Sequence, residues 1–349
     1  MALLFPILEF SKEYKEYNEV SDKITKNGIV VSVIVPMRNE ENYIEKCLQS
    51  ILSQDFPLDK LEVIVVDGLS KDKSQEIVNY YVEKYPNTVR LIENVNKTAP
   101  YAMNIGIEKS VGKYIVRLDA HSEYANDYIS KCIATIEETD ADNVGGLLIT
   151  RGVGLIGEAF AKVLSSKFGV GDSGFRTNAS SGYVDTVPFG TYKRETFEKY
   201  GFYDTRLTRN QDNELNYRIR KNGGKIYLNS NIKLIYFCRN TIPDILRQSF
   251  ENGKWNIITT KLCPGAMSLR HFVPLGFLLS LIIMPVMIFF LPVLIWLFAA
   301  ELGLYLILNL LFSFKLASGI SQIPILFILF PVLHLSYGFG SLVGLLKRK

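Results

Sequence analysis

The chain has 349 residues, of which 48% are apolar and 21% are charged. This length is long for one domain and short for three, and the many aromatic and aliphatic residues exclude a disordered chain. Residues 272–349 hold four basic residues and one acidic residue, which leaves 35 basic and 34 acidic residues in 1–271. That near-neutral front part lacks the basic excess that a nucleic-acid-binding protein needs.

The N-terminus and the cysteines bear on the cellular compartment. The first ten residues, MALLFPILEF, are apolar but lack the basic region of a signal peptide. We expect either a packed strand or helix there, or a short amphipathic membrane anchor. The four cysteines are far apart and have no metal-site spacing, which predicts reduced thiols in a reducing compartment. They are Cys47, Cys132, Cys238 and Cys263.

Short apolar runs alternate with helical stretches through the front part of the chain. Runs rich in branched residues predict buried strands at 30–35, 61–66, 89–92, 113–118 and 144–149. Helices are expected between them at 40–53, 73–85, 99–109 and 126–138. Such alternation predicts an α/β fold with a mostly parallel sheet. The loops at the carboxyl ends of its strands, 36–40, 67–72, 93–98 and 119–123, are then the expected functional loops.

Polar residues follow three of these strands. In the first loop, Pro36 is expected to end strand pairing and Asn39 to cap the next helix, while Arg38 adds charge at a helix N-terminus that favours anions. An ordinary strand–helix turn explains the same residues. In the second loop, Asp67 could accept the N–H of a uracil base. Capping of the next helix by Asp72 or Ser70 is the alternative interpretation of that loop.

Asp119 and His121 follow the fourth strand, two residues apart. A carboxylate suits Mg²⁺ or Mn²⁺, and an imidazole is a less usual partner for such hard ions. Their place at the end of a buried strand predicts convergence on one ion or diphosphate. A structural role for the histidine is the alternative.

Two further stretches carry carboxylates or glycines. Asp212 and Glu214 open a helical stretch at 214–221, and one of them could act as a general base; helix capping by Asp212 is the alternative. The glycines at 152, 154 and 157 form a GxGxxG motif. This motif follows the fifth strand rather than the first, so dinucleotide binding is not favoured.

The C-terminal part is apolar enough for a membrane. Residues 272–300 carry no charge, which exceeds the roughly 20 residues that a span needs. We expect about three spans, at 273–295, 296–314 and 321–343, of which the middle one contains Glu301. The basic cluster at 347–349 favours the cytoplasm. Three spans would place it opposite residues 1–271, whereas two spans, alone or with a re-entrant segment, would place both on one side.

The stretch before these spans, 241–255, has apolar residues at helical spacing. An amphipathic helix at the membrane surface is one interpretation, and a core helix is the other. Gln248 and Trp255 only loosely resemble a Gln…Arg-Trp motif, so processive polymerisation is not inferred.

Five stretches, taken together and in this order, resemble the family 2 glycosyltransferases of the GT-A fold. They are VSVIVPMRNE (31–40), VIVVDGLSKD (63–72), KYIVRLDAHSEY (113–124), PFGTYKRETFEKYGFYD (188–204) and RNQDNELNYRIRKNGG (209–224). With SSKFGVG at 165–171, the chain looks most like membrane-bound glucosyltransferases of succinoglycan-type exopolysaccharide assembly.

The resemblance implies a GT-A domain at 29–240, after an N-terminal segment, 1–28. An interface segment, 241–271, and a transmembrane region, 272–349, would follow it. The resemblance also implies a role for individual residues of the motifs. Pro36, Arg38 and Glu40 would line the nucleotide pocket, and Asp67 would bind the uracil.

The same resemblance assigns the residues nearest the chemistry. Asp119 would bind the donor and, with His121, a divalent metal, Mn²⁺ or Mg²⁺. Asp212 would be the catalytic base. Two positions depart from the family pattern, because His121 replaces an Asp and Gln211 replaces a Glu, so the metal's identity stays open.

The sequence therefore predicts a multi-pass membrane enzyme whose catalytic domain faces the cytoplasm. It would be an inverting glycosyltransferase, a hexosyltransferase that moves a sugar from a nucleotide-sugar, expected to be a UDP-sugar, to a lipid-linked or nascent polysaccharide acceptor. A nucleotidyltransferase would want a glycine-rich loop after the first strand, and PMRNEEN has no glycine. A nucleotide-binding protein that gates the membrane segment is the other alternative. A transporter is not favoured, because the tail holds a single acid.

Overall fold

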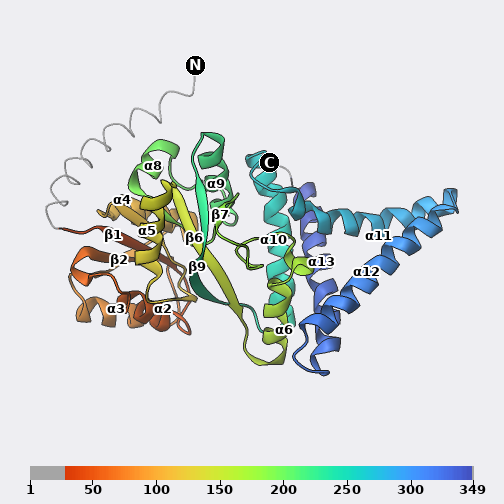
Figure 1. Cartoon of the computed structure of the whole chain (residues 1–349), viewed down its shortest axis with the longest axis horizontal. Helices are drawn as coiled ribbons and strands as arrows, with labels where there is room; N and C mark the ends of the chain where they lie inside the picture. Colours follow the sequence, from red (N-terminus) through yellow and green to blue (C-terminus); the bar gives the residue numbers. More distant parts are fainter. Residues whose placement is uncertain (1–27, 348–349) are drawn as a thin grey trace, which may run out of the picture. The chain divides into compact units, whose positions relative to one another are not determined.

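A computed structural model describes residues 28–347 of the chain, so the predicted N-terminal strand, helix or anchor lies outside the described residues. The chain folds into two compact units. Unit 1 holds residues up to Val144 together with Phe189–Phe202, and unit 2 holds Gly145–Pro188 and Tyr203–Lys349. Figure 1 gives the element labels used below.

Unit 1 contains a mixed sheet with the strand order β3-β2-β1-β4-β8, and β8 also pairs with the first two residues of β6. The first four strands are parallel to one another, and β8 is antiparallel to β4. The strands are β1 (Val31–Met37), β2 (Leu61–Asp67), β3 (Val89–Glu93), β4 (Tyr114–Arg117) and β8 (Thr191–Lys193). The predicted α/β class is confirmed, and the antiparallel strand makes the sheet mixed.

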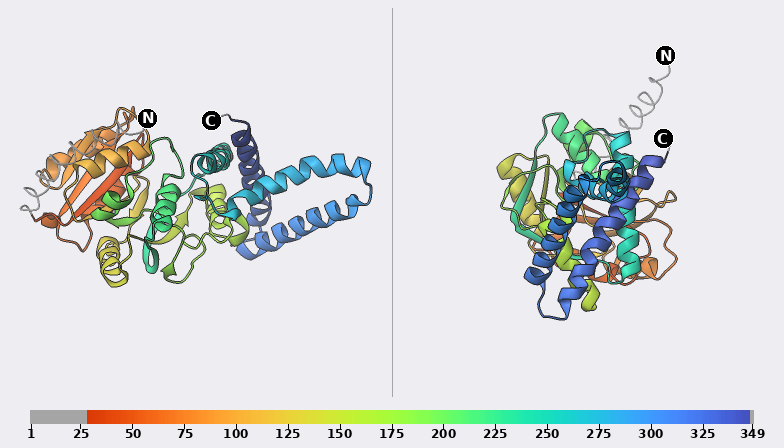
Figure 2. Two further views of the ribbon diagram at one scale, coloured as in Figure 1. Left: turned by 90° about the horizontal axis from the view of Figure 1, so that it is seen from above. Right: turned by 90° about the vertical axis from the view of Figure 1, so that its right-hand side faces the viewer.

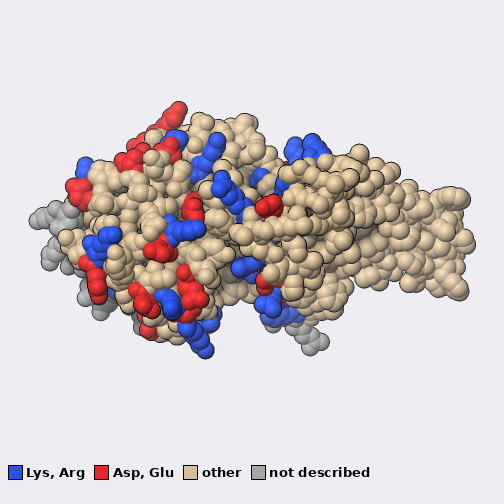
Figure 3. All heavy atoms as spheres, turned by 90° about the horizontal axis from the view of Figure 1, so that it is seen from below, with Lys and Arg blue, Asp and Glu red and all other residues tan. Residues whose placement is uncertain are grey.

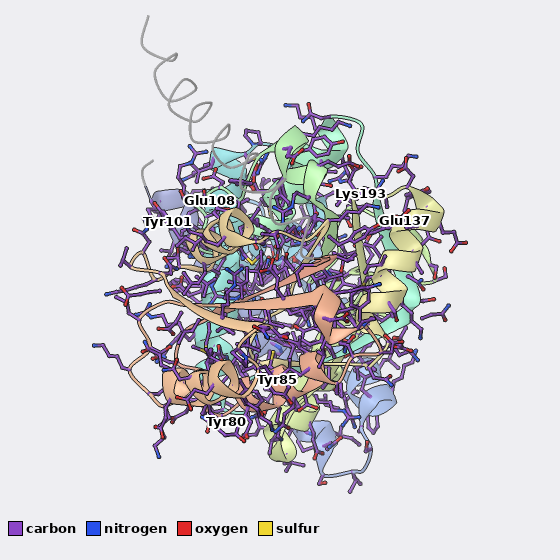
Figure 4. The ribbon with its side chains drawn as sticks, turned by 90° about the vertical axis from the view of Figure 1, so that its left-hand side faces the viewer. Tyr80, Tyr85, Tyr101, Glu108, Glu137 and Lys193 are labelled. Carbon is purple, nitrogen blue, oxygen red and sulfur yellow. The ribbon has the colours of Figure 1, made fainter. Side chains whose placement is uncertain are left out.

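Helices cover both faces of this sheet. In Figure 4, α4 (Ala99–Lys109), which carries Tyr101 and Glu108, lies on one face, and α3 (Ser74–Lys84), which carries Tyr80, lies on the other. Every residue of β2 is buried, as is expected for a strand covered on both sides. Unit 1 also includes β5 (Ser122–Tyr124) and the helices α2 (Ile44–Leu52), α5 (Tyr128–Thr139) and α8 (Arg194–Tyr200).

Two predictions at the end of β1 are wrong. Pro36 does not end strand pairing, because β1 runs on to Met37 and Pro36 lies opposite Val66 of β2. The partner strand β4 ends its pairing with β1 at Ile34, so the missing N–H of the proline interrupts no ladder on that side. Asn39 does not cap α2, which begins at Ile44 with no side-chain cap. Its φ of 56° makes it a turn residue instead.

Unit 2 contains most of β6 (Asn143–Arg151) together with β7 (Gly182–Tyr183) and β9 (Ile226–Phe237). Its helices before the apolar tail are α6 (Gly154–Leu164), α7 (Lys167–Val170), α9 (Gln211–Lys221) and α10 (Ile242–Leu262). The GxGxxG glycines lie at the start of α6, where a Cβ on Gly152 would collide with the backbone of Gly157. Close packing of this turn therefore accounts for those glycines.

Three apolar helices end the chain, namely α11 (Val273–Phe290), α12 (Leu294–Leu316) and α13 (Gln322–Leu346). Among the described residues, these three are long and apolar enough to cross a membrane. The turn Leu291–Val293 joins α11 and α12 into a hairpin, visible in Figure 2. Figure 3 shows no charged side chain on the projecting end of this hairpin, which agrees with the charge-free sequence from 272 to 300.

Candidate active site

The loops after β1 and β2 are joined by hydrogen bonds. The backbone N–H of Asn39 donates to Ser70 Oγ over 2.8 Å, and Asn39 Oδ1 accepts from the N–H of Lys71 over 2.8 Å. The N–H of Glu40 donates to Ser74 Oγ over 2.7 Å. Because these bonds link segments more than 30 residues apart, they fix the two strand-end loops to each other.

Asp67 lies at the end of β2 with 2% of its surface exposed. Its carboxylate accepts from the N–H and the hydroxyl of Ser70, over 3.0 and 2.5 Å, and from Gln75 Nε2 over 2.6 Å. A carboxylate has about four acceptor positions, so these bonds orient the group and leave capacity for one further donor. This arrangement is compatible with the predicted contact to a uracil N–H.

The N-cap residue of α3 is Lys73, so the alternative of capping by Asp72 or Ser70 is wrong, although the carboxylate of Asp72 binds the first residue of that helix. Its Oδ1 accepts from the N–H and hydroxyl of Ser74, at the first turn of α3, and its Oδ2 accepts from the N–H of Glu41 over 3.1 Å. Although partial burial raises the pKa of this carboxyl, the hydrogen bonds from Ser74 and Glu41 outweigh it and lower the pKa. Asp72 is therefore held ionised where it anchors the two loops.

The structure gives Asp119 and His121 different partners. Arg117 Nη2 lies 3.2 Å from Asp119 Oδ1, and both side chains are largely buried. The ring nitrogen Nδ1 of His121 lies 3.3 Å from Glu40 Oε1. Strand β4 thus supplies a cation to the aspartate, and the loop after β1 supplies a carboxylate to the histidine.

The other residues predicted to line the nucleotide pocket lie at the end of β1 and in the loop that follows it. Pro36 is half-buried in β1, and Arg38 is exposed in the loop that follows. Glu40, two residues further on, is brought into contact with His121. The sequence prediction did not include Arg117, although its position two residues before Asp119 places both on the same side of an extended chain.

A metal ion would have two protein side chains available here, Asp119 and His121. Within residues 28–347, no group of three His, Cys, Asp or Glu side chains is arranged to hold a metal. A site with few protein ligands still fits Mg²⁺, which is commonly bound by one or two carboxylates together with substrate phosphates.

Asp212 and Glu214 both lie in the first turn of α9, in unit 2. Glu214 is buried, and its two carboxylate oxygens accept from Arg218 Nε and Nη2 over 2.9 and 2.7 Å. This bidentate pair neutralises Glu214. Asp212 is half-buried, so the two carboxylates differ in burial.

The first turn of α9 is fixed to α10. Asn210, not Asp212, is the N-cap residue of α9, with a left-handed backbone and no capping side chain. Asn210 Nδ2 donates to Asn256 Oδ1 over 2.6 Å, and Arg209 Nη1 donates to Asn252 Oδ1 over 2.7 Å. These bonds hold Asp212 at a defined helix end, and capping by Asp212 is not observed.

Comparison with known proteins identifies relatives along almost the whole chain. Residues 32–201 match the family described as Glycosyl transferase family 2. A similar protein from Methanococcus voltae is named dolichyl N-acetyl-alpha-D-glucosaminyl phosphate 3-beta-D-2,3-diacetamido-2,3-dideoxy-beta-D-glucuronosyltransferase. It is 30% identical over 332 residues, which cover 91% of this chain and 97% of the relative.

Another relative is the succinoglycan biosynthesis protein ExoA of Rhizobium meliloti. It is 28% identical over 261 residues, which cover 73% of this chain and 77% of the relative. Among solved structures, the first 349 residues of S. aureus TarS in complex with UDP align with a TM-score of 0.46 and 19% identity, covering 64% of each chain. The predicted family resemblance, including that to succinoglycan biosynthesis proteins, is confirmed by the sequence relatives.

Proposed function

Because the chain belongs to glycosyl transferase family 2, we propose that it transfers a sugar from a nucleotide-sugar, a UDP-sugar, to a lipid-linked or nascent polysaccharide acceptor, with inversion at the anomeric carbon. The observation that carries the mechanism is the contrast between two neighbouring carboxylates on α9. Arg218 occupies both oxygens of Glu214, whereas Asp212 is half-buried at the helix start.

Asp212 acts as the general base in this mechanism. Its carboxylate takes the proton of an acceptor hydroxyl, and the hydroxyl oxygen attacks the anomeric carbon in line with the leaving diphosphate. The bond from that carbon to the diphosphate oxygen breaks, and its electron pair leaves with the nucleotide. A positioned general base contributes about 10²- to 10⁴-fold to such a rate.

The loops of unit 1 bind the nucleotide in this proposal. Asp67, oriented by Ser70 and Gln75, accepts a uracil N–H, and Pro36, Arg38 and Glu40 line the same pocket. Asp119 and His121 would hold Mg²⁺ or Mn²⁺ together with the donor's diphosphate. The ion would neutralise the charge that develops on the leaving group.

The apolar tail places the enzyme at a membrane, and the cytoplasmic face is the side on which we propose that unit 1 lies. Helices of this length and hydropathy match a hydrocarbon layer of about 30 Å. A lipid-linked acceptor is confined to the bilayer, so anchoring brings the enzyme to its substrate. The basic residues that end the chain agree with a cytoplasmic C-terminus.

Binding and turnover measured on one variant test this function. Asp212→Asn should bind UDP as the wild type does, because the nucleotide-binding residues are in other loops, and should lose transfer from the UDP-sugar. A detergent-purified sample titrated with UDP by calorimetry gives the first quantity, and release of UDP in the presence of acceptor gives the second. Transfer at the wild-type rate would remove Asp212 as the base, and loss of UDP binding would point to misfolding instead.

A further inference from the structure

Three arginines of unit 2 lie around the end of β9. The guanidinium of Arg176 lies 5.4 Å from the ring centre of Tyr236 and 5.6 Å from that of Phe175. The charge of Arg209 acts on Tyr236 and on Arg239, which follows β9 and is exposed. The charges of Arg176 and Arg239 both act on Cys238, which lies between Tyr236 and Arg239 in the chain. We refer to Arg176, Arg209 and Arg239 as the arginine cluster.

The backbone fixes Arg176 in place. The carbonyl of Phe175 accepts from the N–H of Leu148 in β6 over 2.8 Å, and the N–H of Arg176 donates to Ser173 O over 2.9 Å. The loop that carries Arg176 is therefore attached to the sheet of unit 2. A guanidinium held in this way needs no large rearrangement to meet a ligand.

Two polar atoms of this region are buried without a partner among the described residues. They are Nη1 of Arg176 and Oε1 of Gln248. Gln248 lies on α10, and its Nε2 donates to the hydroxyl of Tyr236 over 3.2 Å. A buried polar atom that makes no hydrogen bond costs free energy, so Arg176 Nη1, a donor, is expected to gain an acceptor when an anionic ligand binds.

The side chains of the arginine cluster carry positive charge, which attracts an anion. Burial lowers the pKa of Arg176 and of Arg209, yet a guanidinium stays charged at neutral pH. Glu251 is the carboxylate whose charge acts on Arg209, and it is also paired with Lys254 at 2.5 Å. Arg209 therefore shares the charge of Glu251 with Lys254.

We propose that the arginine cluster binds the phosphate group of a lipid-linked acceptor. Guanidinium groups match phosphate oxygens with paired, charge-assisted hydrogen bonds. The cluster belongs to unit 2, which also carries the membrane helices and Asp212, whereas the predicted nucleotide loops belong to unit 1. Arg209 precedes Asp212 by three residues, so the residues that would hold the acceptor phosphate are joined to the helix that carries the base. This inference rests on the proposed function, of which it names the acceptor's anionic group.

Binding of farnesyl phosphate to the detergent-purified full chain tests the proposal, with farnesol as the uncharged control and UDP as the donor-side probe. Arg176→Gln and Arg239→Gln should each weaken farnesyl phosphate binding about tenfold to a hundredfold and leave UDP binding unchanged. Arg247→Gln, at an exposed position on α10, is the matched control and should change neither. Because Arg239 is exposed, its substitution stays informative if Arg176→Gln fails to fold.

The other outcomes overturn the proposal. Absence of farnesyl phosphate binding to the wild type, equal binding of farnesol, or unchanged binding in both cluster variants would each remove the acceptor site. A loss confined to UDP would assign the cluster to the donor's diphosphate. Wild-type binding of farnesyl phosphate without any sugar transfer would instead refute the proposed function and leave the anion site in place.

A second, independent observation concerns α13. Its first half packs on α6 in one apolar cluster that includes Phe160, Ile245, Leu326 and Phe330. Its second half runs along α10, where Ser336 Oγ and Ser341 Oγ donate to backbone carbonyls of that helix over 2.8 and 3.1 Å. In the most apolar window of α13, 39% of the residues are buried, against 6% for α11 and for α12.

The contact between α10 and α13 is close. A Cβ on Gly253 of α10 would collide with Tyr337 O, and a Cβ on Gly340 of α13 would collide with Phe250 O. Lys261 Nζ donates to three carbonyls at the end of α13, those of Gly344, Leu345 and Lys347, over 2.8–2.9 Å. Helix α10 therefore packs against α13 as far as the last turn of α13.

This packing conflicts with a membrane span, because α10 carries charged residues along its length. They are Asp244, Arg247, Glu251, Lys254 and Lys261. If α13 crossed the bilayer, these side chains would lie at membrane depth, where charged groups are rare and costly. In α11 and α12 only 6% of the residues in the most apolar window are buried, and at 18 and 23 residues these helices measure about 27 and 35 Å.

We infer that α11 and α12 alone enter the hydrocarbon layer, as a hairpin, and that α13 stays on the same side of the membrane as α6 and α10. The basic residues at the end of the chain then lie on the side of the catalytic residues. This arrangement agrees with the preference of basic residues for the cytoplasm.

Protease protection in sealed membrane vesicles tests this topology. The full chain carries one epitope at its N-terminus and another after Lys349, and vesicles of both orientations are treated with protease. Both epitopes should be digested together in vesicles of one orientation and protected together in the other. If one epitope were digested only in vesicles of one orientation and the other epitope only in vesicles of the other orientation, α13 would cross the membrane. That result would overturn the inference.

Discussion

Glu214 and Asp212 are two residues apart on α9, and their substitutions should affect different properties. Substitution of Glu214 should lower the Tm, and substitution of Asp212 should lower turnover. Glu214 is buried and accepts both hydrogen bonds of a bidentate contact from Arg218, whose side chain is 26% exposed. Breaking a buried pair by removing one partner costs about 3–5 kcal/mol, and the partial exposure of Arg218 favours the lower end. A domain of about 150–250 residues loses about 2–4 °C of Tm per kcal/mol, so a loss of about 3 kcal/mol in Glu214→Gln should lower Tm by about 6–12 °C.

Asp212→Asn should leave Tm nearly unchanged, because the carboxylate is half-buried, but should reduce turnover about 10²- to 10⁴-fold. Thermal unfolding in detergent and UDP release, both measured well below the Tm of each variant, separate the two effects. Arg218→Gln is the matched control, and combining it with Glu214→Gln should add little further loss. Loss of turnover in Glu214→Gln at an unchanged Tm would refute this assignment and exchange the roles of the carboxylates.

Three further predictions concern the loops of unit 1 and the helices of unit 2. His121→Ala should raise the Mg²⁺ or Mn²⁺ concentration needed for half-maximal turnover, and an unchanged metal titration would remove the histidine as a ligand. Asp72→Ala should lower stability by about 1 kcal/mol, because the hydrogen bonds that its carboxylate accepts from Ser74 and Glu41 are lost. Because the folded-state pKa of Asp72 is lowered, this contribution is present above its unfolded pKa of about 3.9 and is lost as the pH falls through the folded value. The Tm difference between the wild type and Asp72→Ala should therefore shrink in acid, and a constant difference would contradict the ionic origin. Phe330→Ala should cost about 3–5 kcal/mol, because its ring is fully buried and lies 4.9 Å from that of Phe168; a loss below about 1 kcal/mol would show that the helix contact is not formed.

Much of the fold of unit 1 is predictable from local patterns. Apolar runs bounded by polar loops place β1, β2 and β3 within two residues of their observed limits. The sequence cannot show that β8 joins the sheet antiparallel to β4, because that pairing joins residues more than 70 positions apart. The sequence also cannot show that Pro36 stays within β1. A proline is tolerated there because the neighbouring strand β4 has already ended its pairing with β1.

The candidate site is predictable in its residue types and less so in its pairings. The end-of-strand rule identifies Asp67 and Asp119, but it cannot show that Arg117 pairs with Asp119 or that Glu40 reaches His121. The pairing of Glu214 with Arg218, and the difference in burial between Glu214 and Asp212, also need the structure. The roles of these residues in catalysis and metal binding stay predictions, as do the proposed domain limits at 240 and 271.

The position of α13 has a consequence for how the protein is made. This helix is synthesised after α6 and α10, yet it completes an apolar cluster whose other members are residues of α6, Ile245 of α10 and Cys238. Until α13 leaves the ribosome, Phe160 and Ile245 lack the surface that buries them in the finished protein. Unit 2 therefore reaches its native state only after α13 has been synthesised, and a chain that stops before residue 322 would expose this apolar surface to the cell's quality-control proteases.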